Sequence, residues 1–194
     1  MAPPVRWVEA SMGTTTARCS TVGRVINAYL PLGLPARVLQ ALVALFSSAR
    51  FLVEGESMAP ALSSGQSVLA SRPRLPWDRL RRGDVVVLRH PVWSDRIYIK
   101  RIIGLPGEEV RLKDGRVYLD GAGAPLDEVY LDGPPSQRKD YDRGWLTGTD
   151  EYFVMGDNRS DSQDSRAFGP VQRKRILGRV WLRCWPPRAW GPVR

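Results

Sequence analysis

Ser57 and Lys100 are two residues whose types could combine as a nucleophile and its base. A serine hydroxyl attacks a carbonyl carbon well only when a base removes its proton. A lysine amine can be that base when it is neutral near pH 7, and burial among apolar side chains lowers its usual pKa of about 10.4 by several units. The segment around Lys100 alternates as a strand does, which would place Tyr98 beside it on one face and Ile99 on the other. The pair therefore points to peptide-bond hydrolysis.

Two different interpretations of these residues stay open at this point. Lys100 and Arg101 could form an ordinary basic pair on an exposed strand, and composition by itself favours that interpretation. His90 is the single histidine, and histidine is the usual base for a serine nucleophile. Because it directly precedes Pro91 in what is expected to be a turn at a strand end, we expect a surface histidine with no catalytic role.

The elements that must position these side chains are predicted to be strands. Apolar, β-branched runs bounded by turn residues are typical of strands, and they occur at 83–88, 96–103, 151–155 and 176–182. Asp114 and Gly115 in the middle of 110–119 predict a hairpin. With only a short turn expected at 58–63 and a flexible loop at 132–144, the body is predicted to be mostly β with long loops.

The first fifty residues differ from the rest. The segment 30–49 has 13 apolar residues in 20, which approaches the length of a membrane span, although prolines and polar residues interrupt it. The arginines before it would place the N-terminus in the cytoplasm. We therefore expect residues 1–50 to be a cytoplasmic tail with a helical membrane anchor at about 30–49, and residues 51–194 to be a catalytic domain. A helix lying on the membrane surface and a cleaved signal ending near Ala49 are competing interpretations of the segment.

The net charge of +9 is concentrated at the two ends of the chain. Residues 1–50 carry +4 and residues 171–194 carry +7, while the stretch between them carries −2. A near-neutral centre argues against a nucleic-acid groove, and basic ends suit contact with anionic lipid head groups, unless they only aid solubility. Two distant cysteines and one histidine argue against a disulfide framework or a zinc site, so no metal is expected.

Four segments stand out, in this order along the chain: Ser57-Met-Ala-Pro60, Arg82-Gly-Asp-Val-Val-Val-Leu88, Lys100-Arg-Ile-Ile-Gly-Leu-Pro-Gly107 and Gly156-Asp-Asn-Arg-Ser-Asp-Ser-Gln-Asp-Ser-Arg166. Together they resemble the type I signal peptidase family. The resemblance runs from about Val53 to Val171 and leaves out the first fifty residues. It implies a signal-peptidase-like β-sheet or barrel body and a membrane-anchored Ser/Lys endopeptidase. The substrates would be signal peptides of exported preproteins, cut after a small-x-small motif such as Ala-x-Ala.

The resemblance also implies roles for individual residues. Ser57 would be the nucleophile, Lys100 the general base, and Ser162 a support that hydrogen-bonds the lysine amine. Asp164 and Arg166 would form a structural ion pair behind the site. The reaction would pass through an acyl-enzyme that water hydrolyses, and it would need no cofactor.

The substrate is expected to pair with an exposed strand edge and to place small side chains in shallow apolar pockets. The resemblance assigns the pocket lining to four residues, for which plain core packing is a compatible interpretation: Met58, Leu62, Tyr98 and Ile99. The backbone N–H of Ser57 would be one oxyanion donor. In part of the family a serine two residues earlier supplies a second donor, but this chain has Gly55 there, which leaves the second donor unassigned.

The chain end, 181–190, is rich in Trp and Arg, which suits either a membrane interface or a strand that caps the core. A single-pass protein of the bacterial plasma membrane, with its catalytic domain on the extracytoplasmic side, is the preferred interpretation. A mitochondrial inner-membrane peptidase subunit comes second. Three further functions compete with these: a Ser/Lys self-cleaving repressor, for which residues 1–50 show no convincing DNA-binding motif, a Ser/His hydrolase using His90, and a non-enzymatic basic membrane- or nucleic-acid-binding protein.

Overall fold

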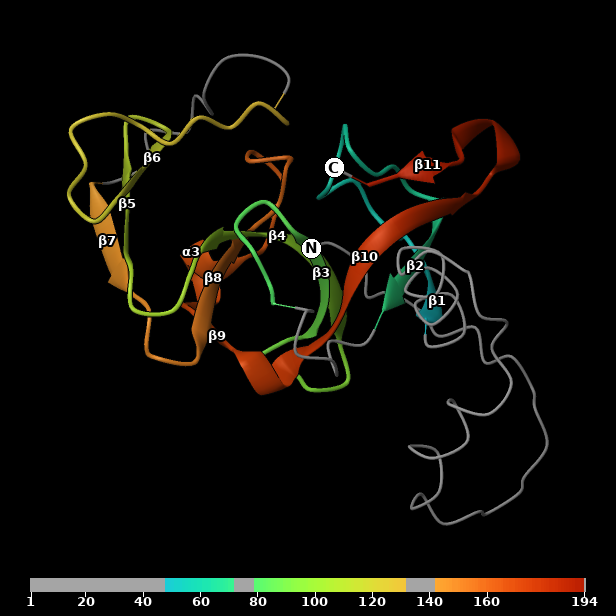
Figure 1. Cartoon of the computed structure of the whole chain (residues 1–194), viewed down its shortest axis with the longest axis horizontal. Helices are drawn as coiled ribbons and strands as arrows, with labels where there is room; N and C mark the ends of the chain where they lie inside the picture. Colours follow the sequence, from blue (N-terminus) through green and yellow to red (C-terminus); the bar gives the residue numbers. More distant parts are fainter. Residues whose placement is uncertain (1–47, 72–78, 132–141, 194) are drawn as a thin grey trace, which may run out of the picture.

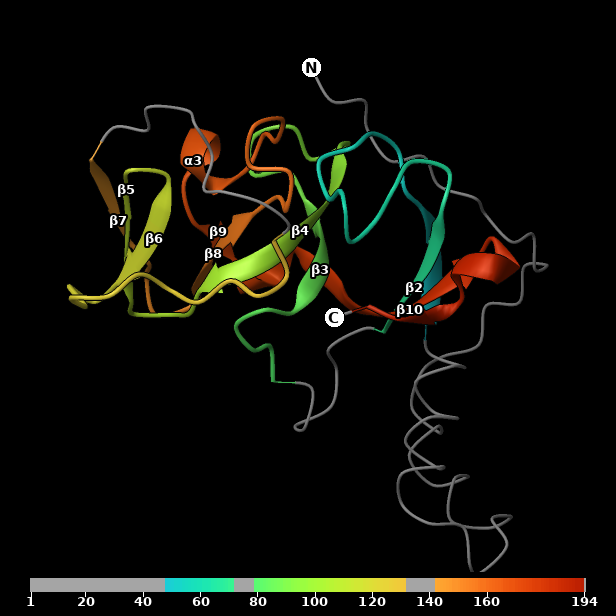
Figure 2. The same cartoon turned by 90° about the horizontal axis from the view of Figure 1, so that it is seen from above.

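The computed structural model describes residues 48–71, 79–131 and 142–193, and these form two antiparallel sheets (Figures 1 and 2). The large sheet contains β1 Ser48–Leu52, β2 Ser67–Ser71, β3 Val85–Arg89, β4 Ile97–Gly104, β8 Glu151–Met155, β9 Val171–Gln172, β10 Ile176–Trp185 and β11 Gly191–Pro192. The small sheet contains β5 Glu109–Lys113, β6 Arg116–Leu119 and β7 Arg143–Leu146. Within these residues the α-helical part is one turn, α3 Ser165–Phe168, and two 3₁₀ turns lie at Arg173–Arg175 and Pro187–Ala189. The prediction of a mostly β body is confirmed.

β4 lies inside the large sheet, whose order is β1-β2-β10-β3-β4-β8-β9 with β11 added beside β10. Every residue of β4 is buried. Its two faces enter different apolar clusters, because Ile97 and Ile99 pack with the residues around Phe51 while Tyr98 and Ile102 pack with Val154 and its neighbours. The predicted alternation of this strand is thus confirmed, and both faces are covered.

The predicted hairpin is confirmed in the small sheet. Lys113 pairs with Arg116, so the turn has two residues, and Asp114 and Gly115 have φ angles of 51° and 72°. Positive φ at both positions is what a tight hairpin turn of the right twist requires. The third strand, β7, was not predicted. The expected loop at 132–144 overlaps its first two residues, Arg143 and Gly144, while 132–141 lie outside the described residues.

The two sheets meet at Gly104, the last residue of β4. A Cβ atom there would lie 2.4 Å from Val110 Cγ2 and 2.9 Å from Phe153 Cβ. Only glycine lets β4, β5 and β8 approach this closely, since both contacts are shorter than any ordinary carbon–carbon packing distance. The small sheet is thereby fixed beside the end of the strand that carries Lys100, at one side of the molecule (Figure 1).

The predicted anchor at about 30–49 lies almost wholly outside the described residues, and β1 begins at Ser48. Among residues 48–71, 79–131 and 142–193, no helix has the length and apolar character of a membrane span. At the other end, the strand predicted at 176–182 is longer than expected, because β10 continues to Trp185. It pairs with β2 and with the short strand β11, which follows it in the chain and was not predicted. This pairing favours the capping-strand interpretation of 181–190, although Trp185 and Trp190 are exposed.

Candidate active site

Ser57 and Lys100 meet directly although they come from different parts of the chain. Lys100 Nζ donates a hydrogen bond of 2.6 Å to Ser57 Oγ. The same geometry serves the reverse direction, in which the hydroxyl donates its proton to a neutral amine. A nucleophile and base within about 2.6–3.2 Å satisfy the geometric requirement for proton transfer.

Ser57 lies on the loop 53–66 that joins β1 to β2, which we call the nucleophile loop. The loop is closed at its base, because Val53 N donates to Gln66 O at 2.8 Å and Gly65 N donates to Val53 O at 2.9 Å. Directly after Ser57, the Met58 side chain is buried, and the Met58 carbonyl accepts a 2.8 Å hydrogen bond from the N–H of Leu62. A partly buried Ser57 therefore sits on a turn whose next apolar side chain is fixed in the core.

Lys100 is on β4 and only 3% of its surface is exposed. Val86 of β3 lies opposite it and is fully buried, and the amine lies 5.3 Å from the centre of the Tyr98 ring. Among the described residues, no carboxylate forms a salt bridge with Lys100. Burial lowers the pKa of Lys100 to about 8, against the charges of Asp164 and Asp157, which act to raise it. A useful fraction of the amine is therefore neutral near physiological pH.

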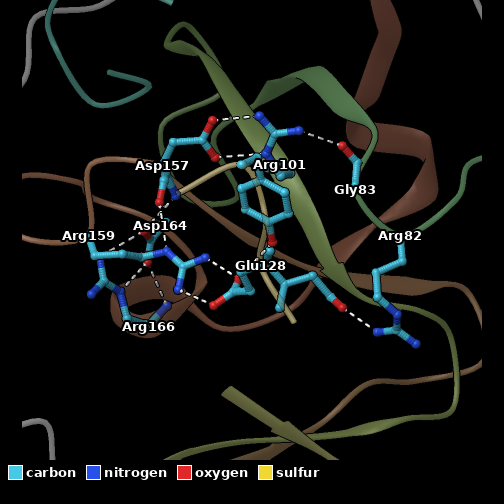
Figure 3. Close-up of polar contacts among 11 residues, drawn as sticks. Arg82, Gly83, Arg101, Glu128, Asp157, Arg159, Asp164 and Arg166 are labelled. Carbon is cyan, nitrogen blue, oxygen red and sulfur yellow. Dashed lines mark hydrogen bonds and ion pairs between the residues drawn. The ribbon is translucent and has the colours of Figure 1, made fainter. Parts of the chain in front are cut away.

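Arg101, the next residue, points to the opposite side of the strand, since side chains alternate along β4. It has a carboxylate partner, Asp157 (Figure 3). Its Nε and Nη2 atoms donate to the two oxygens of Asp157 at 2.8 and 2.6 Å, and Nη1 donates to Gly83 O at 2.8 Å. Both side chains of this pair are at most 1% exposed. The interpretation of Lys100 and Arg101 as an exposed basic pair is wrong, because β4 is covered on both faces.

The turn 156–158, which we call the clamp turn, lies against the nucleophile loop. A Cβ atom on Gly156 would lie 2.4 Å from Ser57 O and 2.3 Å from Ser162 Oγ, so glycine is required there by close approach. The next residue, Asp157, is the partner of Arg101. Asn158 contacts the nucleophile loop through its backbone N–H and its side-chain amide. In the sequence this turn stood out only as part of the segment Gly156–Arg166, and no role was predicted for Asp157 or Asn158.

Asp164 and Arg166 form an ion pair with a 2.9 Å contact from Arg166 Nε (Figure 3). Asp164 is completely buried, caps α3 and also accepts a 3.0 Å hydrogen bond from Gly156 N. Burial acts to raise the pKa of Asp164, but the hydrogen bonds and charge of Arg166 and the Gly156 N–H hold it below its usual value. Ser162 Oγ is buried beside Gly156. No hydrogen bond of ordinary geometry joins it to the described residues, but its hydroxyl is directed at Asp164 closely enough to help lower the pKa of that carboxyl group. Its contact with the lysine amine stays a prediction.

A second buried ionic group contacts the clamp turn, because Arg159 Nε donates to Gly156 O at 3.1 Å (Figure 3). Arg159 pairs with Glu128, and Glu128 also accepts a 2.6 Å hydrogen bond from the Tyr130 hydroxyl. The Arg101 guanidinium lies 4.1 Å from the centre of the Tyr130 ring. These contacts link the segment 128–130 both to Arg159, which follows the clamp turn, and to Arg101 on β4. They were not predicted, because no local sequence pattern pairs residues so far apart.

The four residues predicted to line the substrate pocket are all buried. Met58, Leu62 and Ile99 belong to one apolar cluster, next to the turn of Ser57. Tyr98 lies on the other face of β4 with Lys100, and its hydroxyl donates to Gln163 Oε1 at 2.9 Å. The structure thus brings three of the four together and places the fourth beside Lys100.

The expectation of a surface histidine at position 90 is wrong. His90 is 1% exposed and stacks on Trp93, with Tyr98 and Phe168 at the edges of its ring. Its Nδ1 accepts hydrogen bonds of 3.1 Å from the N–H groups of Val92 and Trp93, so it holds the turn after β3 in its neutral form. The local Pro91 signal for a turn was sound, but it could not show that aromatic side chains cover this turn.

Comparison with known proteins gives the family. A family profile described as "Signal peptidase, peptidase S26" matches residues 26–185. A signal peptidase I from Leptolyngbya laminosa is 36% identical over 150 residues, which cover 73% of this chain and 70% of that protein. A signal peptidase I from Bacillus caldolyticus is 37% identical over 156 residues, covering 73% and 82%. The crystal structure of a signal peptidase I from Enterococcus faecalis has a TM-score of 0.45 and 32% identity, and covers 52% of this chain and 96% of that one.

The matched range contains every part of the site described above, from the nucleophile loop through β4 to α3. The relatives come from bacteria, which agrees with the preferred origin. The relatives match 73% of this chain at 36% and 37% identity, and both are signal peptidases. This match favours a signal peptidase over the two competing functions of a self-cleaving repressor and a non-enzymatic binding protein. The chain belongs to the signal peptidase family, peptidase S26, and is a serine endopeptidase that removes signal peptides from preproteins.

Proposed function

We propose that this chain cuts signal peptides after a small-x-small motif, with Ser57 as nucleophile and Lys100 as general base. The observation that carries the proposal is the 2.6 Å contact between Lys100 Nζ and Ser57 Oγ, made by a lysine that is 3% exposed. An amine with its pKa lowered to about 8 by burial is matched to base catalysis near neutral pH.

The reaction begins when the Ser57 hydroxyl transfers its proton to Lys100 Nζ. The Oγ atom bonds to the scissile carbonyl carbon, and the carbonyl π electrons move to its oxygen. When the tetrahedral intermediate collapses, the C–N bond breaks and the Lys100 ammonium returns the proton to the leaving amine. A water molecule then attacks the acyl-enzyme carbonyl carbon while Lys100 accepts one of its protons. When this second tetrahedral intermediate collapses, the C–O bond to Ser57 breaks, the Lys100 ammonium returns the proton to Ser57 Oγ, and the signal peptide leaves with a new carboxyl end.

The oxyanion is stabilised in this proposal by the backbone N–H of Ser57. The Ser57 N–H donates no hydrogen bond to any of the described residues, so it is free to bind the substrate oxygen. The N–H of Gly55 already donates to Ser64 Oγ at 3.3 Å, and glycine has no side chain to supply a second donor. The pocket for the small residue before the cut is shaped by four side chains: Met58, Leu62, Tyr98 and Ile99. The Ser162 hydroxyl orients the lysine amine.

The location of the enzyme is also proposed. The segment at about 30–49 is a single membrane anchor that leaves 51–194 on the extracytoplasmic side of the bacterial plasma membrane. The basic ends contact anionic lipid, and nucleic acid is not a partner. The apolar composition of 30–49 and the positive charge before it support this topology.

The test is cleavage of a preprotein with an Ala-x-Ala site by the full chain in detergent. Ser57→Ala and Lys100→Ala should each lower kcat/KM at least about 10³-fold, because each removes one partner of the dyad. His90→Asn is the control, since an asparagine oxygen can still accept the turn N–H groups that Nδ1 accepts. Activity that survives Lys100→Ala, or is lost in a folded His90→Asn variant, would overturn the lysine mechanism.

A further inference from the structure

Asn158 holds both peptide groups that flank the Ser57 Cα atom. Its backbone N–H donates to Ser57 O at 3.1 Å, and its side-chain Nδ2 donates to Glu56 O at 3.2 Å. Glu56 O also accepts a 3.1 Å hydrogen bond from Ala59 N within the nucleophile loop itself. One residue of the clamp turn therefore reaches across to two successive carbonyl groups of the nucleophile loop.

The contact to Glu56 O sets the direction of the Ser57 N–H. A peptide group is planar, and in its trans form the C=O of one residue and the N–H of the next point in opposite directions. Fixing Glu56 O on the side of Asn158 thus aims the Ser57 N–H away from the clamp turn. That N–H has no acceptor among the described residues.

The Asn158 side chain is itself held in place. Its Oδ1 accepts hydrogen bonds from Ser160 Oγ at 2.8 Å and from Asp161 N at 3.3 Å. The preceding residue, Asp157, is anchored to β4 through the buried pair with Arg101. The donor that meets Glu56 O therefore comes from a turn that is fixed to the strand carrying Lys100.

We propose that Asn158 is a positioning residue that orients the 56–57 peptide so that the Ser57 N–H meets the oxyanion of the transition state. The inference rests on the proposed Ser57/Lys100 mechanism, which it deepens. Because donors in such sites act on charge that develops only in the transition state, the loss should appear in kcat rather than in KM.

The experiment measures kcat and KM for full-length wild type, Asn158→Ala and Asn158→Asp with the same preprotein in detergent. Asn158→Asp keeps an oxygen for Ser160 and Asp161 but removes the donor to Glu56 O. Both variants should lose about tenfold in kcat with KM unchanged, since Ala59 N still holds part of the peptide. Asp142→Asn, which changes one exposed side chain outside the nucleophile loop and the clamp turn, should stay within about twofold of wild type.

A second readout separates positioning from general disruption. A peptide aldehyde that ends in Ala forms a tetrahedral adduct with Ser57 and places its oxygen where the oxyanion forms, so its affinity should fall about tenfold in both Asn158 variants. The affinity of an uncleavable peptide, which has no group in the oxyanion position, is measured beside it and should not change. The inference would be overturned, with the proposed mechanism left standing, if Asn158→Asp kept the kcat of the wild type or if the affinities for the aldehyde and the uncleavable peptide fell equally. A wild type that cleaves no signal peptide would overturn it together with the proposed mechanism.

Discussion

The two faces of β4 carry neighbouring buried basic side chains, Lys100 and Arg101, whose surroundings differ in one respect: among the described residues, only Arg101 has a carboxylate partner. Lys100 is 3% exposed and its amine contacts a neutral hydroxyl, whereas Arg101 is 1% exposed and lies between two carboxylate oxygens and a carbonyl. Burial without a paired carboxylate favours the neutral form of a lysine. Burial with a bidentate carboxylate keeps a guanidinium charged. The same strand can therefore hold a base on one face and a permanent ion pair on the other.

In the proposed mechanism this difference separates catalysis from support. The Lys100 amine would accept and then release a proton in each half of the reaction, so its neutral form cannot depend on a salt bridge. The Arg101 face joins β4 to the clamp turn through Asp157, and that turn contacts the backbone of Ser57. The position of Ser57, which the proposed chemistry on the Lys100 face needs, is therefore fixed from the Arg101 face.

Lys100→Arg would abolish the difference between the faces, because both would then carry the same type of side chain. Arginine is not deprotonated in proteins, so it cannot take the Ser57 proton even though it keeps the positive charge. We expect kcat/KM to fall at least about 10³-fold in a preprotein cleavage assay. Detectable activity close to wild type would show that charge, rather than basicity, is needed at this position.

On the other face, Arg101→Met should affect stability first. It leaves the Asp157 carboxylate buried without its partner, which costs about 3–5 kcal/mol of unfolding free energy. Denaturant unfolding measures this loss. The matched control is Arg111→Met, which breaks the exposed pair with Asp142, whose side chains are 53% and 47% exposed, and should not change stability measurably. Equal effects in the two variants would contradict the structural role of the Arg101 face.

The clamp turn connects the Arg101 face to Ser57, and Gly156→Ala tests this connection. The added Cβ would have to displace Ser57 O or Ser162 Oγ, which would lie at 2.4 and 2.3 Å from it. A misplaced nucleophile should lower kcat about 10²-fold, as a shift of about 1 Å does elsewhere. Gly123→Ala, where a Cβ meets nothing within 4 Å, is the control for cleavage rate and thermal unfolding.

A more modest effect is expected in the pH profile of the Lys100 face. Activity should rise with pH through the Lys100 pKa of about 8, since only the neutral amine accepts a proton, and fall about tenfold per unit below it. The charge of Asp161 helps to raise that pKa, so Asp161→Asn should move the midpoint of the kcat/KM profile to lower pH. Asp142→Asn, at the exposed residue directly before β7, should leave the midpoint unchanged. A profile that falls between pH 7 and 9 would contradict the role of Lys100 as base.

The local elements of this fold were largely predictable because their signals lie within a few residues. The Asp114–Gly115 turn and the alternation of β4 are dictated by backbone sterics and side-chain period, and both predictions are confirmed. β7 was missed because Arg143–Leu146 is exposed along most of its length, and a strand with little apolar pattern is recognised only by its partner β5. The membrane anchor at about 30–49 stays a prediction.

The residues proposed to carry the chemistry could be named from the amino-acid order, since the Ser57, Lys100 and Gly156–Arg166 segments are specific enough to indicate the family. Their surroundings could not. Burial of Lys100, the partner of Arg101, the enclosure of His90 and the contacts of Asn158 all depend on residues that are distant along the chain and meet only in the folded protein. A side chain's pKa and orientation follow from those neighbours, because burial and charge act through space.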